Sequence, residues 1–404
     1  MTKRSLALSA VLVMLALSSA LIGCRSAHTT SAILYIEQNN YQKAIDVIEE
    51  GLYYTPNDPE AYYYQGEAYS RMAQQAIQDN DYLLAKRSFE NAYARYMRAK
   101  EMNPDAMSDR VAEALEINYR NTLREGQGMW RDRHYEEAEG FFRLAYAAVP
   151  DSLNSIKSIA GMKIQQAELL PDDPNTAKAL RLEALALLDQ VLVAQPDAYR
   201  LRADKAYVLT QLDRTDDAQA IYDDLLRQHG EDPELLLDVV GLYGKQERHE
   251  EAAGLFLKVA EIFLNDTDPT NDARLKELYS EAGFNFRQAK DYSRAIEAYG
   301  LASEQDVYDI MLLVERQQLF LLYGQELLTQ AAQAVTEDPA RSQALEAEGL
   351  AALRRGVEVG NAVTNLAPGN ADGFYFLANT LALLGDEAGF NENMATYNEL
   401  TGIQ

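Results

Sequence analysis

The chain has 404 residues, of which 47% are hydrophobic, and its formal net charge is -26. This length and apolar content are sufficient for a large folded body, whereas the strong negative charge argues against binding to nucleic acid or to anionic lipid head groups. The single cysteine excludes a disulfide bond within the chain.

The N-terminal segment combines a basic start with an apolar run, Leu6–Ile22, and ends in Leu21-Ile22-Gly23-Cys24. This ending resembles the lipobox of bacterial lipoproteins. The resemblance implies a signal peptide at residues 1–23 that is removed, acylation of Cys24, and a short tether at residues 24–30. The alternative is an uncleaved membrane helix, but the run is shorter than the roughly 20 apolar residues that a spanning helix needs.

Helical stretches with recurring punctuation follow. Prolines stand where amphipathic stretches end, and an Asp or Asn follows each of them; they are Pro56, Pro104, Pro150 and Pro196. A proline just past a helix stops it, and the Asp or Asn can cap the next helix. Inside the stretches, a small residue, a bulky residue and a small or aliphatic residue recur at spacings that share one helix face. The triplets begin at Ala44, Ala92, Ala138, Ala184, Ala218, Ala252 and Ala295.

The steps from Ala184 to Ala218 and from Ala218 to Ala252 are 34 residues each, which is the period of the tetratricopeptide repeat. The chain resembles this family in its small and aromatic positions as well, for example Gly283 and Phe286. The resemblance implies an all-α fold, a right-handed superhelical solenoid of antiparallel helix pairs. Repeats are expected over residues 31–309, and residues 310–404 are expected to form degenerate helical repeats and a cap.

Two departures from the family pattern are visible. The early prolines are 46–48 residues apart, so the early repeats contain additional helical turns, and long helices are expected at Tyr62–Asp79 and Ala106–Asp132. The motif then fades over Ile310–Leu366, where Gly356 and Gly360 stand in place of Ala and a bulky residue. About nine helix pairs are expected in all.

Signals for enzyme chemistry are weak. The four histidines lie far apart in the sequence, and His249-Glu250-Glu251-Ala252-Ala253 lacks the second histidine of a zinc protease motif. Gly126-Gln127-Gly128 has no third glycine and no preceding strand, so it does not match a dinucleotide-binding loop. The sequence therefore predicts a protein that is not an enzyme, with no catalytic residues, no metal site and no cofactor.

Family resemblance implies a groove along the first helices of the pairs, the A helices. The side chains expected on it or beside it are Tyr63, Glu67, Arg71, Arg120, Trp130, Arg131, Tyr207, Phe284 and Arg287. Aromatic and arginine side chains in a groove favour the binding of peptides or proteins. The alternative interpretation is that the aromatic members are packing residues. The lysine clamp of the chaperone-binding members is missing, because the equivalent positions hold other residues, such as Tyr63 and Leu237.

The leading functional hypothesis is a lipid-anchored scaffold that binds envelope proteins or their peptide segments. Arg25 after the anchor resembles outer-membrane sorting in enteric bacteria, so we expect a location at the outer membrane facing the periplasm, with a Gram-positive surface anchor as the alternative. A second hypothesis is a ligand-binding accessory lipoprotein of a transport system, with a small molecule in a cavity between helices. Residues 310–366 and their glycines are the candidate lining of that cavity.

Overall fold

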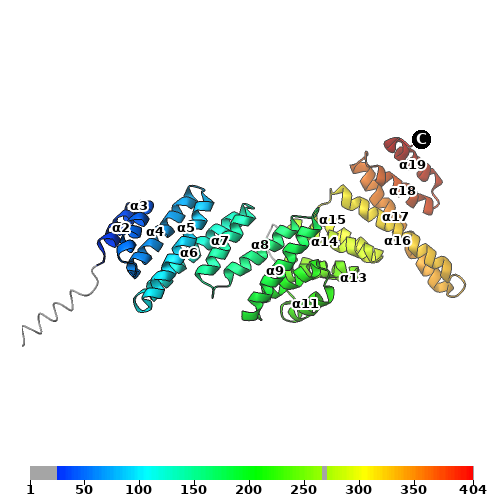
Figure 1. Ribbon diagram of the computed structural model, residues 1–404. Helices are drawn as coiled ribbons and strands as arrows, with labels where there is room; N and C mark the ends of the chain where they lie inside the picture. The colour runs from blue at the N-terminus through cyan, green and yellow to red at the C-terminus, as the bar shows by residue number, and fades with distance from the viewer. Residues whose placement is uncertain (1–24, 266–270, 404) are drawn as a thin grey trace, which may run out of the picture. The chain divides into compact units, whose positions relative to one another are not determined.

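A computed structural model describes residues 25–265 and 271–403 (Figure 1). Within these ranges the chain forms eighteen α-helices and no strand. Consecutive helices pack against each other as antiparallel pairs. The predicted all-α fold of tetratricopeptide-like helix pairs is confirmed, and the described helices make up the nine pairs that the sequence predicts.

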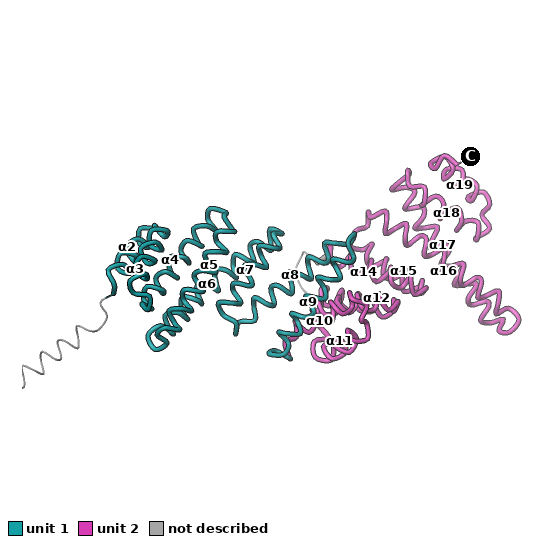
Figure 2. The backbone as a smooth tube through the Cα atoms, in the orientation of Figure 1, with its two compact units in different colours: residues 1–196 teal, residues 197–404 magenta. Residues whose placement is uncertain are grey.

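The chain divides into two compact units, residues 1–196 and 197–404 (Figure 2). The described helices of unit 1 are α2 (Ala27–Glu37), α3 (Tyr41–Tyr54), α4 (Pro59–Gln78), α5 (Tyr82–Met102), α6 (Pro104–Arg131), α7 (Tyr135–Ala148), α8 (Asn154–Glu168) and α9 (Pro174–Ala194). Those of unit 2 are α10 (Tyr199–Gln211), α11 (Thr215–His229), α12 (Pro233–Lys245), α13 (His249–Leu264), α14 (Asn271–Gln288), α15 (Tyr292–Gln305), α16 (Ile310–Ala334), α17 (Pro339–Leu366), α18 (Ala371–Leu383) and α19 (Glu387–Thr401). The even-numbered helices are the A helices, and in unit 1 they contact one another in sequence.

The prolines act at helix starts as well as at helix ends. Asp58 caps α4 by accepting a hydrogen bond from the Ala61 amide, as predicted. Pro104, in contrast, is the first residue of α6, and Asn103 in front of it is the cap, so the expectation that Asp105 would cap this helix is wrong. The first helical position suits proline because the amide hydrogen that proline lacks would have no partner there.

A single residue in left-handed conformation joins the two helices of most pairs. Six non-glycine residues have φ between 57° and 64°, and Gly385 has φ 80°; the six are Asn39, Asn80, Arg133, Asp213, Glu247 and Lys290. Each lies in the turn between an A helix and its partner. Among the described pairs, the turn lacks such a residue only in α8–α9 and α16–α17. The first of these turns contains the polar sequence Pro171-Asp172-Asp173, and the second lies in the region where the repeat motif fades.

Close contact between the helices of a pair depends on glycine. A Cβ atom at Gly66 would lie 2.8 Å from the Tyr96 ring, one at Gly126 2.7 Å from Phe142, and one at Gly283 2.7 Å from Tyr299. The bulky position of each second helix therefore fills the space that the glycine of the first helix leaves open. The bulky residues are the central members of the sequence triplets, and the glycines stand at the small positions of the first helices.

The faded segment forms the long hairpin α16–α17. A Cβ at Gly324 would lie 2.6 Å from the Leu353 side chain and 3.1 Å from the Gly349 carbonyl oxygen. Gly360 is equally constrained, because its Cβ would approach Nε2 of Gln317 to 2.5 Å. These glycines of the hairpin therefore permit close helix packing.

The N-terminal helix begins inside the predicted tether. Ser26 caps α2 through the Thr29 amide, and Thr29 is completely buried, so residues from Ala27 onward belong to the first helix pair. Cys24 and the predicted signal peptide lie outside the described residues. Within the described part, none of the helices combines the length and apolar character needed to cross a bilayer.

Candidate partner-binding surfaces

Three of the predicted site residues lie together in unit 1. Tyr63, Glu67 and Arg71 are on α4, and they line a pocket of about 460 Å³ that α5 and α6 complete. The contributions of the other two helices include Tyr96 from α5 and Glu113 from α6. The pocket is open to solvent and combines aromatic rings with charges of both signs, a composition suited to a peptide segment.

Arg110 on α6 covers Tyr63. Its guanidinium carbon lies 4.1 Å from the centre of the Tyr63 ring, within the range of a cation–π contact, and its Nη1 donates to Glu60. Burial and the neighbouring charge of Glu67 raise the pKa of Tyr63, so its phenol is neutral at physiological pH. The sequence analysis missed Arg110, because only the packing of α6 against α4 places it there.

The floor of this pocket is formed by buried side chains that contact one another. Tyr96 is 3% exposed and its ring centre lies 5.5 Å from that of Tyr63. Ser70 donates a hydrogen bond to Oδ1 of Asn118, so α4 and α6 are joined below the surface. Arg71 lies 3.6 Å from Glu67 in an exposed ion pair that an incoming partner can rearrange at low cost.

The remaining predicted residues of unit 1 are not part of this pocket. Trp130 packs edge-on against Phe142, and its Nε1 donates to Oε1 of Gln165 at 2.6 Å, so it connects α6 to α8 as the packing interpretation predicts. Arg120 forms an exposed ion pair with Glu116 at 3.7 Å. Arg131 is exposed in the last turn of α6, where its charge complements the helix dipole.

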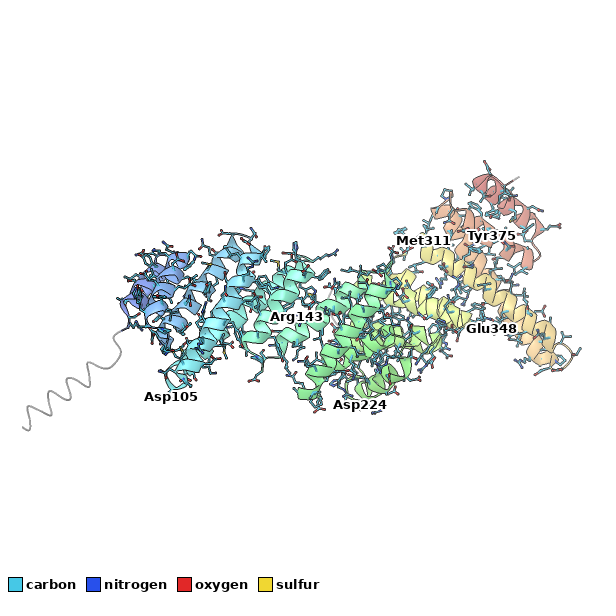
Figure 3. The ribbon with its side chains drawn as sticks, viewed as in Figure 1. Asp105, Arg143, Asp224, Met311, Glu348 and Tyr375 are labelled. Atoms are coloured by element: carbon cyan, nitrogen blue, oxygen red, sulfur yellow. The ribbon has the colours of Figure 1, made fainter. Side chains whose placement is uncertain are left out.

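The predicted residues of unit 2 lie on two helices, α10 and α14. Phe284 on α14 is 46% exposed, whereas Tyr207 on α10 is half-buried. Arg287 on α14 is paired with Glu315 on α16, so its charge is used within the unit. Ion pairs of this kind also join α10 to α11, where Arg202 donates to Asp224 at 2.6 Å (Asp224 is labelled in Figure 3).

The sequence analysis did not identify two carboxylates of unit 2 as candidate site residues. Asp204 on α10 and Asp238 on α12 are 34 residues apart, and thus occupy the same position in successive repeats. Burial, and after it the charge of Asp204, raises the pKa of Asp238 to about 7. The signal that could have found them was the 34-residue period itself, applied to charged positions as well as to small and bulky ones.

Within the described residues, no group of three or more His, Cys, Asp or Glu side chains is arranged to hold a metal ion. Two of the histidines contact neighbouring helices. His229 stacks on Tyr199 at 4.0 Å, and Nδ1 of His249 lies 3.4 Å from Oδ1 of Asn285.

Comparison with known proteins finds similarity to one repeat family in part of the chain. The family model "Tetratricopeptide repeat" matches residues 182–237, which run from α9 into α12. Among solved structures, the chain is similar to YrrB, described as a TPR protein with an unusual peptide-binding site (15% identity, covering 54% of this chain and 93% of that chain, TM-score 0.36). It is also similar to a tetratricopeptide repeat protein from Parabacteroides merdae (13%, 78% and 98%, TM-score 0.39) and to pilF of Pseudomonas aeruginosa (15%, 62% and 95%, TM-score 0.33). No curated protein matches the chain.

Proposed function

Since residues 182–237 match the family model of the tetratricopeptide repeat, we propose that the protein is a non-catalytic scaffold of the bacterial cell envelope that binds segments of other proteins on its A helices. The observation that carries the proposal is the pocket of Tyr63, Glu67 and Arg71. Aromatic and arginine side chains contribute most of the binding energy in many protein interfaces, and here a buried floor holds them in place.

The anchor is proposed to be the acylated Cys24, with the body at the outer membrane facing the periplasm. Only Arg25 and Ser26 separate Cys24 from the first residue of α2, so the first helix pair would lie at the membrane surface. More than one acyl chain would make such an anchor stable, since each buried methylene adds about 0.8 kcal/mol.

The test is crosslinking in cells, followed by purification of the tagged protein and mass spectrometry. The wild type is expected to recover a stoichiometric envelope protein from the membrane fraction, and Cys24→Ala is expected to lose both the membrane location and this partner. If neither sample enriches a protein, the scaffold proposal is wrong.

A second pair of variants locates the contact on the surface. Arg71→Glu reverses a charge inside the pocket, and Arg98→Glu reverses one outside it on α5. The two arginines are an equal match, since each side chain is 52% exposed and each is paired with a glutamate of its own helix. Loss of the partner in Arg71→Glu alone supports the pocket, and equal effects of both variants contradict its role.

One observation favours the second candidate, a ligand-binding accessory lipoprotein. A pocket of about 260 Å³ between α15, α16 and α17 is lined by Phe320, Glu348 and Arg355, among others (Glu348 is labelled in Figure 3). Beside it, Arg316 lies 5.7 Å from the Phe320 ring, and its buried Nε has no hydrogen-bond partner among the described residues. Native mass spectrometry tests this candidate: a retained small molecule supports it, and a bare protein contradicts it.

A further inference from the structure

Asp204 and Asp238 lie on neighbouring A helices. Helices α10 and α12 contact each other, and the 34-residue spacing gives both carboxylates the same position on them. Asp204 is exposed and Asp238 is half-buried, so a molecule in solution can reach the pair. They stand next to Ala203 and Leu237, the positions that correspond to Tyr63 in unit 1.

Neither carboxylate is neutralised within the described part of the chain, where neither makes a hydrogen bond or an ion pair. The charge of Arg200 lowers the pKa of both carboxylates, but its Nη2 is already bound to Asp232 at 2.9 Å and to Glu234 at 2.8 Å. Two like charges at close range normally attract a counter-charge or a proton. The protein therefore holds an acidic pair without the partner that such pairs usually have.

The charges of both carboxylates act on a buried tyrosine of the neighbouring helix α11. Tyr222 on α11 is 0% exposed, and its hydroxyl has no hydrogen-bond partner of acceptable geometry among the described residues. The hydroxyl of Thr210 nearby already donates to the Ala206 carbonyl oxygen at 3.0 Å. Burial raises the pKa of Tyr222, and the charges of Asp238 and Asp204 raise it further, whereas the hydroxyl of Thr210 lowers it. A buried hydroxyl without a hydrogen-bond partner of acceptable geometry is costly.

The surroundings are strongly negative. Residues 197–404 contain 17 Lys and Arg against 37 Asp and Glu, a net charge of -20. Such a field attracts cations and accelerates their approach. A bare divalent cation is a poor occupant, because calcium takes six to eight oxygen ligands and the described residues offer no cluster of three acidic or histidine side chains here.

We propose that Asp204 and Asp238 bind a lysine or arginine side chain of a partner segment, and that unit 2 thereby selects basic segments. A guanidinium carries five donors in a planar fork and can bridge two carboxylates. The inference rests on the proposed scaffold function and adds to it the charge class of the partner.

The test uses the full chain without its signal peptide, and a dye-labelled hexa-arginine peptide as the probe. Fluorescence anisotropy at physiological ionic strength measures its affinity, and a hexa-citrulline peptide is the uncharged equivalent. The double variant D204N/D238N is expected to weaken binding of the arginine peptide at least about tenfold, as close charge pairs do when one partner is removed. Circular dichroism melting checks that the variant is folded.

A control variant distinguishes binding at the Asp204–Asp238 pair from the general attraction between the acidic protein and a basic peptide. E346Q/E392Q removes two charges from exposed positions on α17 and α19 of the same unit and is expected to leave the affinity within about twofold. Equal losses in both variants, or no loss in D204N/D238N, would overturn the inference. The cellular crosslinking experiment, repeated with D204N/D238N, keeps the two proposals distinct: a partner recovered equally by the wild type and by this variant leaves the scaffold intact and contradicts the basic-segment site.

Discussion

The two units are built from the same helix pairs but present different chemistry at equivalent positions. Unit 1 contains 20 basic and 26 acidic residues, a net charge of -6, whereas unit 2 has a net charge of -20. At the position where unit 1 has Tyr63 beneath Arg110, unit 2 has Ala203 and Leu237, each followed by an aspartate. The helix pair therefore fixes where a side chain lies, and the residue at that position decides what it can bind.

Both units share the close contact between a glycine of the first helix and an aromatic ring of the second helix. Replacing the glycine is expected to disrupt this contact in either unit. Gly126→Leu and Gly283→Leu place a side chain against Phe142 and Tyr299, and each is expected to lower the free energy of unfolding by about 3 kcal/mol, the upper end for overpacking. Chemical denaturation measures the effect.

Gly128→Leu in α6 is the control, because a Cβ there meets no atom within 4 Å. It is expected to be neutral or slightly stabilising, since leucine favours helix more than glycine does. A cost at position 128 equal to that at position 126 would mean that the glycine–aromatic contact is not what holds the pair together.

The two units differ in charge, and we expect the raised pKa of Asp238 in unit 2 to make the free energy of unfolding depend on pH. The pKa of this residue is raised to about 7, first by burial and then by Asp204. Asp232, Glu234 and Arg200 also act on it, the arginine in the opposite direction. Above pH 7 the folded state must hold an unfavourable charge. As the pH falls from about 7 toward 4, the folded state binds a proton that the unfolded state does not, so the wild type gains stability.

Asp238→Asn is therefore expected to stabilise the protein at pH 8 by about 2 kcal/mol, less than the full shift implies because solvent screens the site. The gain should disappear by about pH 4. Thermal melting across this range measures it, with Glu346→Gln as the control for loss of one exposed charge. A gain that is independent of pH would contradict the raised pKa.

The affinity for the arginine peptide is also expected to depend on salt concentration. The arginine peptide binds unit 2 through charge, so its affinity is expected to fall about tenfold, roughly 1.4 kcal/mol, as the ionic strength rises from about 0.05 to 0.5 M. Anisotropy in a salt series checks this. The D204N/D238N variant should show a shallower dependence than the wild type, and identical slopes would mean that the pair takes no part.

The periodicity of the sequence predicted the helices and their pairing, because small and bulky residues spaced three and four apart lie on one helix face and indicate close contact with a second helix. It also placed Tyr63, Glu67 and Arg71 on one helix face. It could not place Arg110 above Tyr63, since that contact depends on how α6 crosses α4. The close contact within the hairpin α16–α17 was beyond the sequence for a related reason: Gly324 and Gly349 pack directly against each other in the structure, and no repeat position predicts this contact.

The turns between paired helices were also beyond the sequence, because their left-handed residues share no residue type. Arg133 in unit 1 and Lys290 in unit 2 have φ of 64° and 61°, a conformation that costs a residue with a Cβ roughly 1 kcal/mol relative to glycine. Arg133→Gly and Lys290→Gly are therefore each expected to stabilise the protein by about 0.5 kcal/mol, because the greater entropy of glycine in the unfolded chain offsets part of the gain. Gly385→Ala at φ 80° should destabilise it by a similar amount. Denaturant titration of the three variants measures these effects, and a loss of stability in either glycine variant would mean that the turn side chain makes contacts worth more than the strain it carries.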